Sequence, residues 1–228
     1  MSIAKRFARV IRTLLAPLTR PAVRAMPYAQ FTFAALGRIA KASGNVRPAH
    51  IHHAQRLMFD LGFGADDRRR AIVWFEAGKK PEFDFAPLAL DCRNTVGDRD
   101  VLNEMALESL CVIAWAEGPP NADCRRELER LARLLGIDTQ ELTAAETRVA
   151  DYQRRQLPIG LRRAYQLLGV DHWVDDDQLK LAYRRLMSRH HPDKLGAAAD
   201  ARDAQHAREN SVAIRDAYDL IRASRNAV

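Results

Sequence analysis

Apolar residues recur three and four positions apart through most of the chain, which is the spacing of helices that bury one face. Runs of β-branched residues that would indicate strands are scarce. Turn residues separate the periodic stretches, as where Ser43-Gly44-Asn45 ends one predicted helix and Pro48 opens the next. The pattern therefore predicts an all-α protein.

The predicted helices are separated by short polar or glycine-containing segments. A Pro/Phe-rich connector spans 80–87, and a further helix begins near residue 98. The other expected helices cover 3–18, 30–42, 48–61, 66–78, 143–152, 161–168, 175–190 and 202–223.

The middle of the chain contains an internal repeat. Placing Leu36 on Leu110, 74 positions later, brings two similar segments into register. The other aligned pairs are Ile39/Ile113, Ala40/Ala114, Ala42/Ala116, Gly44/Gly118, Arg56/Arg130, Leu57/Leu131, Leu61/Leu135 and Gly62/Gly136. Self-similarity of this kind predicts a duplicated helical hairpin whose two copies pack around a shared core.

Charged residues are unevenly distributed along the chain. The chain is 47% hydrophobic and 29% charged, as in ordinary soluble globular proteins, with a net charge of +7. Residues 1–59 hold ten basic and no acidic residues, residues 60–150 carry a net −6, and residues 151–228 carry a net +3. Both ends of the chain therefore favour acidic partners or surfaces.

Residues 3–18 form a basic amphipathic segment that is too short and too charged to span a bilayer. Three alternatives remain open for it. It lies in an anionic membrane surface, it docks on the following domain or on a second copy of the chain in a homodimer, or it is a mitochondrial transit peptide. Pro17, Pro21 and Pro27 then predict a linker.

The segment 179–195 combines an apolar helical face with a cationic stripe. Lys180 and Arg184, like Arg185 and Arg189, are four positions apart and lie on one side of the helix. Pro192 should end this helix at about residue 190 or 191, because it lacks an N–H and disfavours helical geometry in the preceding residue. The carboxylate that follows is expected on an exposed turn.

This segment resembles helix II and the HPD loop of a J-domain, the module by which J-proteins stimulate DnaK-type ATPase chaperones. The tripeptide His191-Pro192-Asp193 alone is weak evidence, but its context is specific. The motifs of the family appear in order as Tyr165-x-x-Leu168-Gly169-Val170, Lys180-x-Ala182-Tyr183-Arg184-Arg185-Leu186, and Ile214-x-x-Ala217-Tyr218-x-x-Ile221.

The resemblance implies a partner and a set of contact residues. The residues that would meet an acidic surface of the DnaK-type chaperone are Lys180, Tyr183, Arg184, Arg185, Arg189 and Lys194. Asp193 in the His191-Pro192-Asp193 loop would reach a partner arginine, so catalysis belongs to the partner, and this chain is expected to be neither an enzyme nor a cofactor-binding protein. Ser211 departs from the family, which often has phenylalanine there, and predicts looser packing of the third helix.

The middle region resembles a TerB-like helical domain, a family named after tellurite-resistance proteins. Acidic residues near the repeated glycines have suggested metal binding in that family. Here the second copy has Glu117 and Glu127 whereas the first has Ser43 and His53, a poor ligand set for a hard cation. Solvated surface positions are the simpler interpretation of both glutamates. The histidines near Pro48 lack a metal-binding motif, and His52 and His53 are expected to face water.

The order of these two regions resembles the arrangement of DjlA-type co-chaperones. The expected organisation is an N-terminal helix and linker in 1–27, a TerB-like domain in 28–152, a linker in 153–160 and a J-domain in 161–228. DjlA-type proteins normally begin with a transmembrane segment, which this chain lacks. The resemblance implies the bacterial cytoplasm or the cytosolic face of the inner membrane, with client proteins that the sequence does not identify.

Other classes of function find less support. Cys92, Cys111 and Cys124 form no CxxC pair, which argues against a zinc ribbon and a disulfide framework. No aromatic stacking platform accompanies the cations, which argues against nucleic-acid binding. The remaining alternative is a TerB-like scaffold that binds metal or a partner, with a J-domain of restricted or lost activity.

Overall fold

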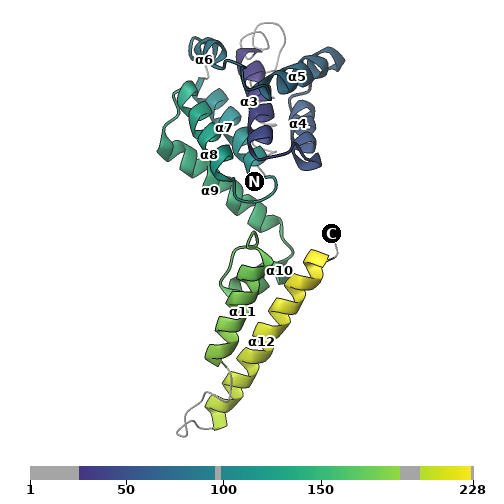
Figure 1. Cartoon of the computed structure of the whole chain (residues 1–228), viewed down its shortest axis with the longest axis vertical. Helices are drawn as coiled ribbons and strands as arrows, with labels where there is room; N and C mark the ends of the chain where they lie inside the picture. Colours follow the sequence, from purple (N-terminus) through teal and green to yellow (C-terminus); the bar gives the residue numbers. More distant parts are fainter. Residues whose placement is uncertain (1–25, 96–98, 191–200, 227–228) are drawn as a thin grey trace. The chain divides into compact units, whose positions relative to one another are not determined.

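The computed structural model describes residues 26–95, 99–190 and 201–226 (Figure 1). These residues form α-helices and no strand, which confirms the all-α prediction. The helices are α3 (Met26–Ala42), α4 (Pro48–Asp60), α5 (Ala65–Gly78), α6 (Ala86–Arg93), α7 (Arg99–Ala114), α8 (Ala122–Leu135), α9 (Thr139–Gln156), α10 (Ile159–Leu168), α11 (Asp176–His190) and α12 (Ala201–Asn226). The helix expected in 3–18 lies outside the described residues.

The chain divides into two compact units. The first extends to Ala150 and contains α3 to α8 with most of α9, and the second starts at Asp151 and contains α10 to α12. Each unit has its own apolar core.

Helix α3 is the centre of the first unit. It packs against α5, α7, α6, α8 and α4, and Figure 1 shows it between α4 and α5 on one side and α7 and α8 on the other. Its middle is buried on every side, since all residues from Phe31 to Gly37 are buried. A helix that is apolar all round requires neighbours on all faces.

The crossing of α3 and α5 depends on two glycines. A Cβ atom added to Gly37 would lie 2.0 Å from the carbonyl oxygen of Phe75, and one added to Gly78 would lie 1.8 Å from that of Ala34. The two backbones are therefore in direct contact. The Nε of Arg38 donates a hydrogen bond to the Gly78 carbonyl at 3.0 Å, which satisfies the end of α5.

The structure confirms the duplicated hairpin, which consists of α3–α4 and α7–α8. Gly44 and Gly118 follow the first helix of each copy with φ angles of 121° and 122°. Gly62 and Gly136 follow the second helix with φ angles of 67° and 79°. Because L-residues with a side chain rarely adopt such φ values, glycines occupy equivalent positions after the helices of both copies.

Some helix boundaries differ from the sequence prediction. Helix α6 was not predicted, because its eight residues are too few for a periodic pattern and its start overlaps the Pro/Phe-rich connector. The Asp84 carboxylate accepts a hydrogen bond from the Ala86 N–H at 2.9 Å beside its first turn. Helix α3 begins at Met26, so Pro27 lies in its first turn and does not belong to a linker.

The predicted helix 143–152 and the expected linker 153–160 also differ from the structure. Helix α9 runs to Gln156 and α10 starts at Ile159, so only Leu157 and Pro158 separate them. Pro158 prevents continuation of α9 through this point because it lacks an N–H and restricts the residue before it.

The second unit is built on α12, which packs against both α10 and α11. Its core contains Leu168 and Leu179 together with Ile214, Ala217 and Ile221, and the partly buried Leu186 packs against it. Helices α11 and α12 are antiparallel, since the start of α11 bonds to the end of α12 and the end of α11 bonds to the earlier part of α12.

Arg225 near the end of α12 joins all three helices of this unit. Its Nη1 donates to the Asp176 carboxylate and its Nη2 donates to the Val174 carbonyl, both at 2.6 Å. Its Nε lies 3.4 Å from the Tyr165 hydroxyl on α10. Helix α11 starts with the Asp175 carboxylate accepting a hydrogen bond from the Gln178 N–H at 2.7 Å.

His53 does not face water, contrary to the sequence prediction. Its Nε2 lies 3.1 Å from the carbonyl oxygen of Ser109 on α7. Burial lowers the pKa of His53 to about 4, against the opposing effect of this hydrogen bond. His53 is half-buried, whereas His50 is fully buried and its Nδ1 accepts a hydrogen bond from the Arg47 N–H at 3.0 Å. His53 therefore joins the two repeats as a neutral imidazole at neutral pH.

We expect Gly37→Ala to lower the free energy of unfolding by about 2–3 kcal/mol, because the methyl group would clash with the backbone of α5. The control is Gly64→Ala, whose added Cβ meets no atom within 4 Å and whose φ is −70°. That variant should stay within about 0.5 kcal/mol of the parent protein. Urea unfolding measures both, and equal stabilities would contradict the tight crossing.

We expect His53 to make stability depend on pH. Its pKa is lower in the folded protein than in the unfolded chain, so its contribution is complete above pH 6.5 and is lost as the pH falls towards 4. The loss should reach about 2 kcal/mol at pH 5. Urea unfolding of the protein and its His53→Gln variant from pH 7.5 to 4.5 measures the difference, and parallel stability curves would contradict this pKa.

Candidate partner-binding surface

One face of α11 carries the cations predicted to bind a partner. Lys180, Arg184, Arg185 and Arg189 are all exposed. Within the described parts of the chain, none of the four forms an ion pair or a side-chain hydrogen bond. Lys180 and Arg184 lie one turn apart on the side opposite the buried Leu179 and Ala182, whereas Arg185 and Arg189 lie one turn apart along the border of the buried face. The face therefore presents positive charge that no described residue neutralises.

Tyr183 borders this face and also belongs to the core. Its ring stacks on that of Tyr218 from α12, with 4.4 Å between the ring centroids and 23° between the ring planes. The tyrosine is half-buried, so one part of the ring packs inside the unit. This stacking fixes the orientation of the side chain relative to the neighbouring cations.

Leu181 lies on the same exposed surface, and the sequence analysis missed it. Its side chain is 68% exposed although it is adjacent to Lys180 and one helical turn before Arg184 and Arg185. The sequence could have indicated that Leu181 is exposed, because this leucine lies between cationic positions on the polar side of the helix.

The cationic helix is described as far as His190. His191, Pro192, Asp193 and Lys194 lie outside the described residues. Their roles therefore stay predictions from the sequence.

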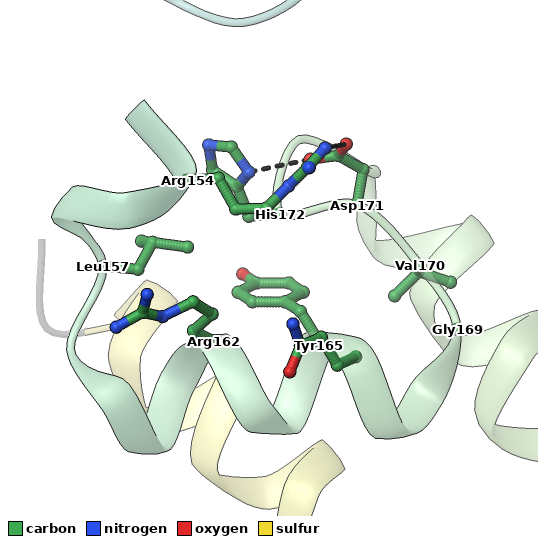
Figure 2. Close-up of a pocket in the computed structure, with 9 residues that line it drawn as sticks. Arg154, Leu157, Arg162, Tyr165, Gly169, Val170, Asp171 and His172 are labelled. Carbon is green, nitrogen blue, oxygen red and sulfur yellow. Dashed lines mark hydrogen bonds and ion pairs between the residues drawn. The ribbon is translucent and has the colours of Figure 1, made fainter. Parts of the chain in front are cut away.

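A cavity of about 260 Å³ lies between the end of α9, α10 and the loop after it (Figure 2). Of the residues that line it, Arg154 bonds to Asp171 at 2.9 Å and also to the nearby Asp151 at 3.0 Å, and Nδ1 of His172 is 2.7 Å from Asp171. Burial favours a higher pKa for Asp171, but hydrogen bonding to Arg154 and its charge outweigh that effect and lower the pKa. These contacts fasten the last turn of α9 to the loop.

The aromatic wall of this cavity is formed by Tyr165, whose ring projects from α10 towards His172 (Figure 2). Burial lowers the pKa of His172, although the neighbouring Asp171 carboxylate acts in the opposite direction. None of the residues that line the cavity belongs to α11. The sequence analysis did not predict this cavity, because the spacing of its residues within 154–172 follows no single helical periodicity.

The two glutamates considered as metal ligands each pair with an arginine. Glu117 forms an ion pair with Arg47, and Glu127 is 3.2 Å from Arg130. Across the residues that the structure describes, no group of three or more His, Cys, Asp or Glu side chains is arranged to hold a metal ion. The Arg47–Glu117 pair links the loops of the two repeated hairpins.

The three cysteines are buried as free thiols in the first unit. Burial raises the pKa of Cys92 to about 12 and that of Cys124 to about 11, and it also raises the pKa of Cys111. These thiols are therefore protonated at neutral pH and poorly suited to nucleophilic or metal-binding roles. In the described part of the chain, no helix has the length and apolar character needed to cross a membrane.

Two family models match the chain in the expected order. The model described as tellurite resistance protein TerB matches residues 29–147, and the model of the DnaJ domain matches residues 163–226. The second match contains the whole of the exposed cationic face of α11. A TerB-like region followed by a C-terminal J-domain is thereby confirmed.

Several proteins named co-chaperone protein DjlA are similar to most of the chain. The protein of Shewanella oneidensis is 33% identical over 200 residues, which covers 85% of this chain and 76% of the relative. That of Coxiella burnetii is 30% identical over 234 residues, which covers 98% of this chain and 87% of the relative. That of Vibrio vulnificus is 31% identical over 216 residues, or 83% and 75% of the two chains. No solved structure matches the chain. With both domains matched in order and this identity sustained along most of its length, the chain belongs to the DjlA family of co-chaperones.

Proposed function

We propose that this protein is a co-chaperone that binds a DnaK-type chaperone through its J-domain and stimulates the ATPase activity of that partner. The observation that carries the proposal is the exposed cationic face of α11, inside a DnaJ-domain match, on the helix that leads directly to His191-Pro192-Asp193. The names of the related DjlA proteins support the same role.

The charge of α11 indicates the chemistry of the partner surface. Cations at Lys180, Arg184, Arg185 and Arg189 are exposed, so they lose little hydration on meeting an acidic surface. Contacts of this kind accelerate association and fix orientation more than they add affinity, and salt weakens them. We therefore propose a fast, weak and salt-sensitive complex.

In this mechanism the J-domain carries out no covalent chemistry. It binds one conformation of the partner more tightly than another, and the difference in affinity shifts the partner towards the conformation that hydrolyses ATP. Asp193 provides the carboxylate that reaches a partner arginine, and the cations of α11 hold the two proteins in register. DjlA proteins form a family of co-chaperones and not a class of enzymes, which agrees with this division of roles.

The TerB-like domain, for which we propose bounds of 28–152, targets or regulates the J-domain of residues 161–228. The matches to residues 29–147 and 163–226 support these bounds. We propose a location in the cytoplasm or at the cytosolic face of the bacterial inner membrane, with residues 3–18 as the segment that meets anionic lipid. The client proteins and the ligand of the TerB-like domain are not identified by the residues described above.

We expect the protein to stimulate single-turnover ATP hydrolysis by a DnaK-type chaperone, and we expect His191→Gln to abolish the stimulation. His191 begins the tripeptide on which the proposed contact depends, and circular dichroism would show whether the variant keeps its helices. Absence of stimulation by the folded parent protein would reject the proposal. It would favour the alternative of a TerB-like scaffold whose J-domain has restricted or lost activity.

We expect the double substitution Arg184→Ala and Arg185→Ala to raise the concentration for half-maximal stimulation by about tenfold, because two exposed charges contribute about 1.4 kcal/mol together. Added salt should reduce the difference from the parent. Arg215→Ala is the matched control, since this arginine is exposed on α12. An equal effect of the control would show that overall charge and not the α11 face determines binding.

A further inference from the structure

The outer side of α11 carries one large apolar side chain among its cations. Leu181 is 68% exposed. The other exposed leucines that the structure describes, Leu90, Leu167 and Leu220, are 49%, 47% and 45% exposed. Leu181 belongs neither to the buried core of the second unit nor to the partly buried side chains packed against it. Its side chain therefore adds little to the packing of this unit and is open to contact by another molecule.

Leu181 lies between two rows of positive charge. An α-helix turns by about 100° per residue. Viewed along α11, Lys180 and Arg184 therefore lie on one side of Leu181. Arg185 and Arg189 lie on its other side, towards the border of the buried face. A single exposed leucine is common on protein surfaces, but this one is the apolar centre of a face with cations on both sides.

An apolar centre with a charged border is the usual anatomy of a protein–protein contact. Water is excluded from the centre of such an interface, whereas the polar rim stays hydrated. Arginine suits the rim, because its aliphatic stem covers apolar surface while its guanidinium group pairs with carboxylates. Arg184 and Arg185 are the cations nearest to Leu181 around the helix, so their stems would enclose the leucine in a complex.

We propose that Leu181 is the apolar anchor of the partner-binding face and enters an apolar recess bordered by carboxylates on the DnaK-type chaperone. The charge of the face identifies the occupant, since four exposed cations around the leucine repel a basic surface and attract an acidic one. This inference rests on the proposed function. It adds a chemical requirement for the partner, whose acidic surface must contain an apolar patch.

The anchor and the surrounding cations should have separable effects on binding. Exposed charges mainly raise the association rate, and salt weakens their effect. Burial of an apolar side chain mainly slows dissociation. Leu181→Ala removes three carbon atoms from the contact, so it should weaken binding about tenfold through faster dissociation. The association rate and the dependence of affinity on salt should stay close to those of the parent protein.

The experiment measures binding of the full-length protein to an immobilised, ATP-bound DnaK-type chaperone by surface plasmon resonance at low and high salt. Stimulation of ATP hydrolysis is measured in parallel. Leu181→Met keeps an apolar side chain of similar volume and should bind within about threefold of the parent. Leu181→Lys adds another cation and should weaken binding about tenfold, because an ammonium group is costly to bury in an apolar recess. A face that acts by charge alone would instead bind more tightly with this lysine.

Leu220→Ala is the matched control. It makes the same chemical change at an exposed leucine of α12, one helical turn after the exposed Asp216 and away from the cations of α11. This variant should bind as the parent does. Thermal unfolding followed by circular dichroism should show that the variants keep the parent fold, because both leucines lie outside the buried core.

Faster dissociation of Leu181→Ala with an unchanged salt dependence, together with weaker binding of Leu181→Lys, would support the proposal. Parent-like binding of Leu181→Ala, tighter binding of Leu181→Lys or an equal loss in Leu220→Ala would overturn the anchor and leave the proposed function intact. If the parent protein neither binds the chaperone nor stimulates its ATPase, the proposed function fails and the anchor fails with it.

Discussion

The first unit depends on burial of the middle of α3. Because the residues from Phe31 to Gly37 are buried on all sides of this helix, α4, α5, α6, α7 and α8 all pack around it. Close enclosure is possible only because Gly37 and Gly78 let two backbones touch where α5 crosses. The need to enclose α3 also explains the aromatic residue Phe85, which directly precedes α6. Its side chain is fully buried and packs edge to face with the ring of Phe31.

The second unit has the opposite requirement, because the charged side chains of the proposed binding surface must remain exposed to water. Its apolar core runs as a narrow strip along α12. At the two ends of this strip, where apolar packing contributes least, polar contacts by Arg225 and Ser211 join α12 to α11. The outer side of α11 is therefore not needed to pack the core of this unit. The cations there can therefore serve recognition without being required for folding.

The sequence predicts best where a single residue determines backbone geometry. Gly44 in the Ser43-Gly44-Asn45 turn predicted the end of α3, and Pro48 predicted the start of α4. Prediction failed where the decisive contact joins distant segments, as with the imidazole of His53 and the Ser109 carbonyl. Periodicity places a residue on a helix face, but it does not show which neighbouring group its side chain will reach. Ser211 illustrates this limit, since its size and polarity predicted looser packing but did not predict that its hydroxyl donates a hydrogen bond to the His190 carbonyl.

The burial of all three native thiols makes the molecule well suited to site-directed labelling. Cys92, Cys111 and Cys124 are enclosed and have pKa values raised by burial, so maleimide and spin-label reagents should react with them slowly while the protein is folded. A cysteine introduced at an exposed position such as Arg215 would then be the principal reactive site, with no need to replace the native cysteines. A fluorescent or paramagnetic reporter on α12 could thus follow encounters with other proteins in an otherwise unaltered background.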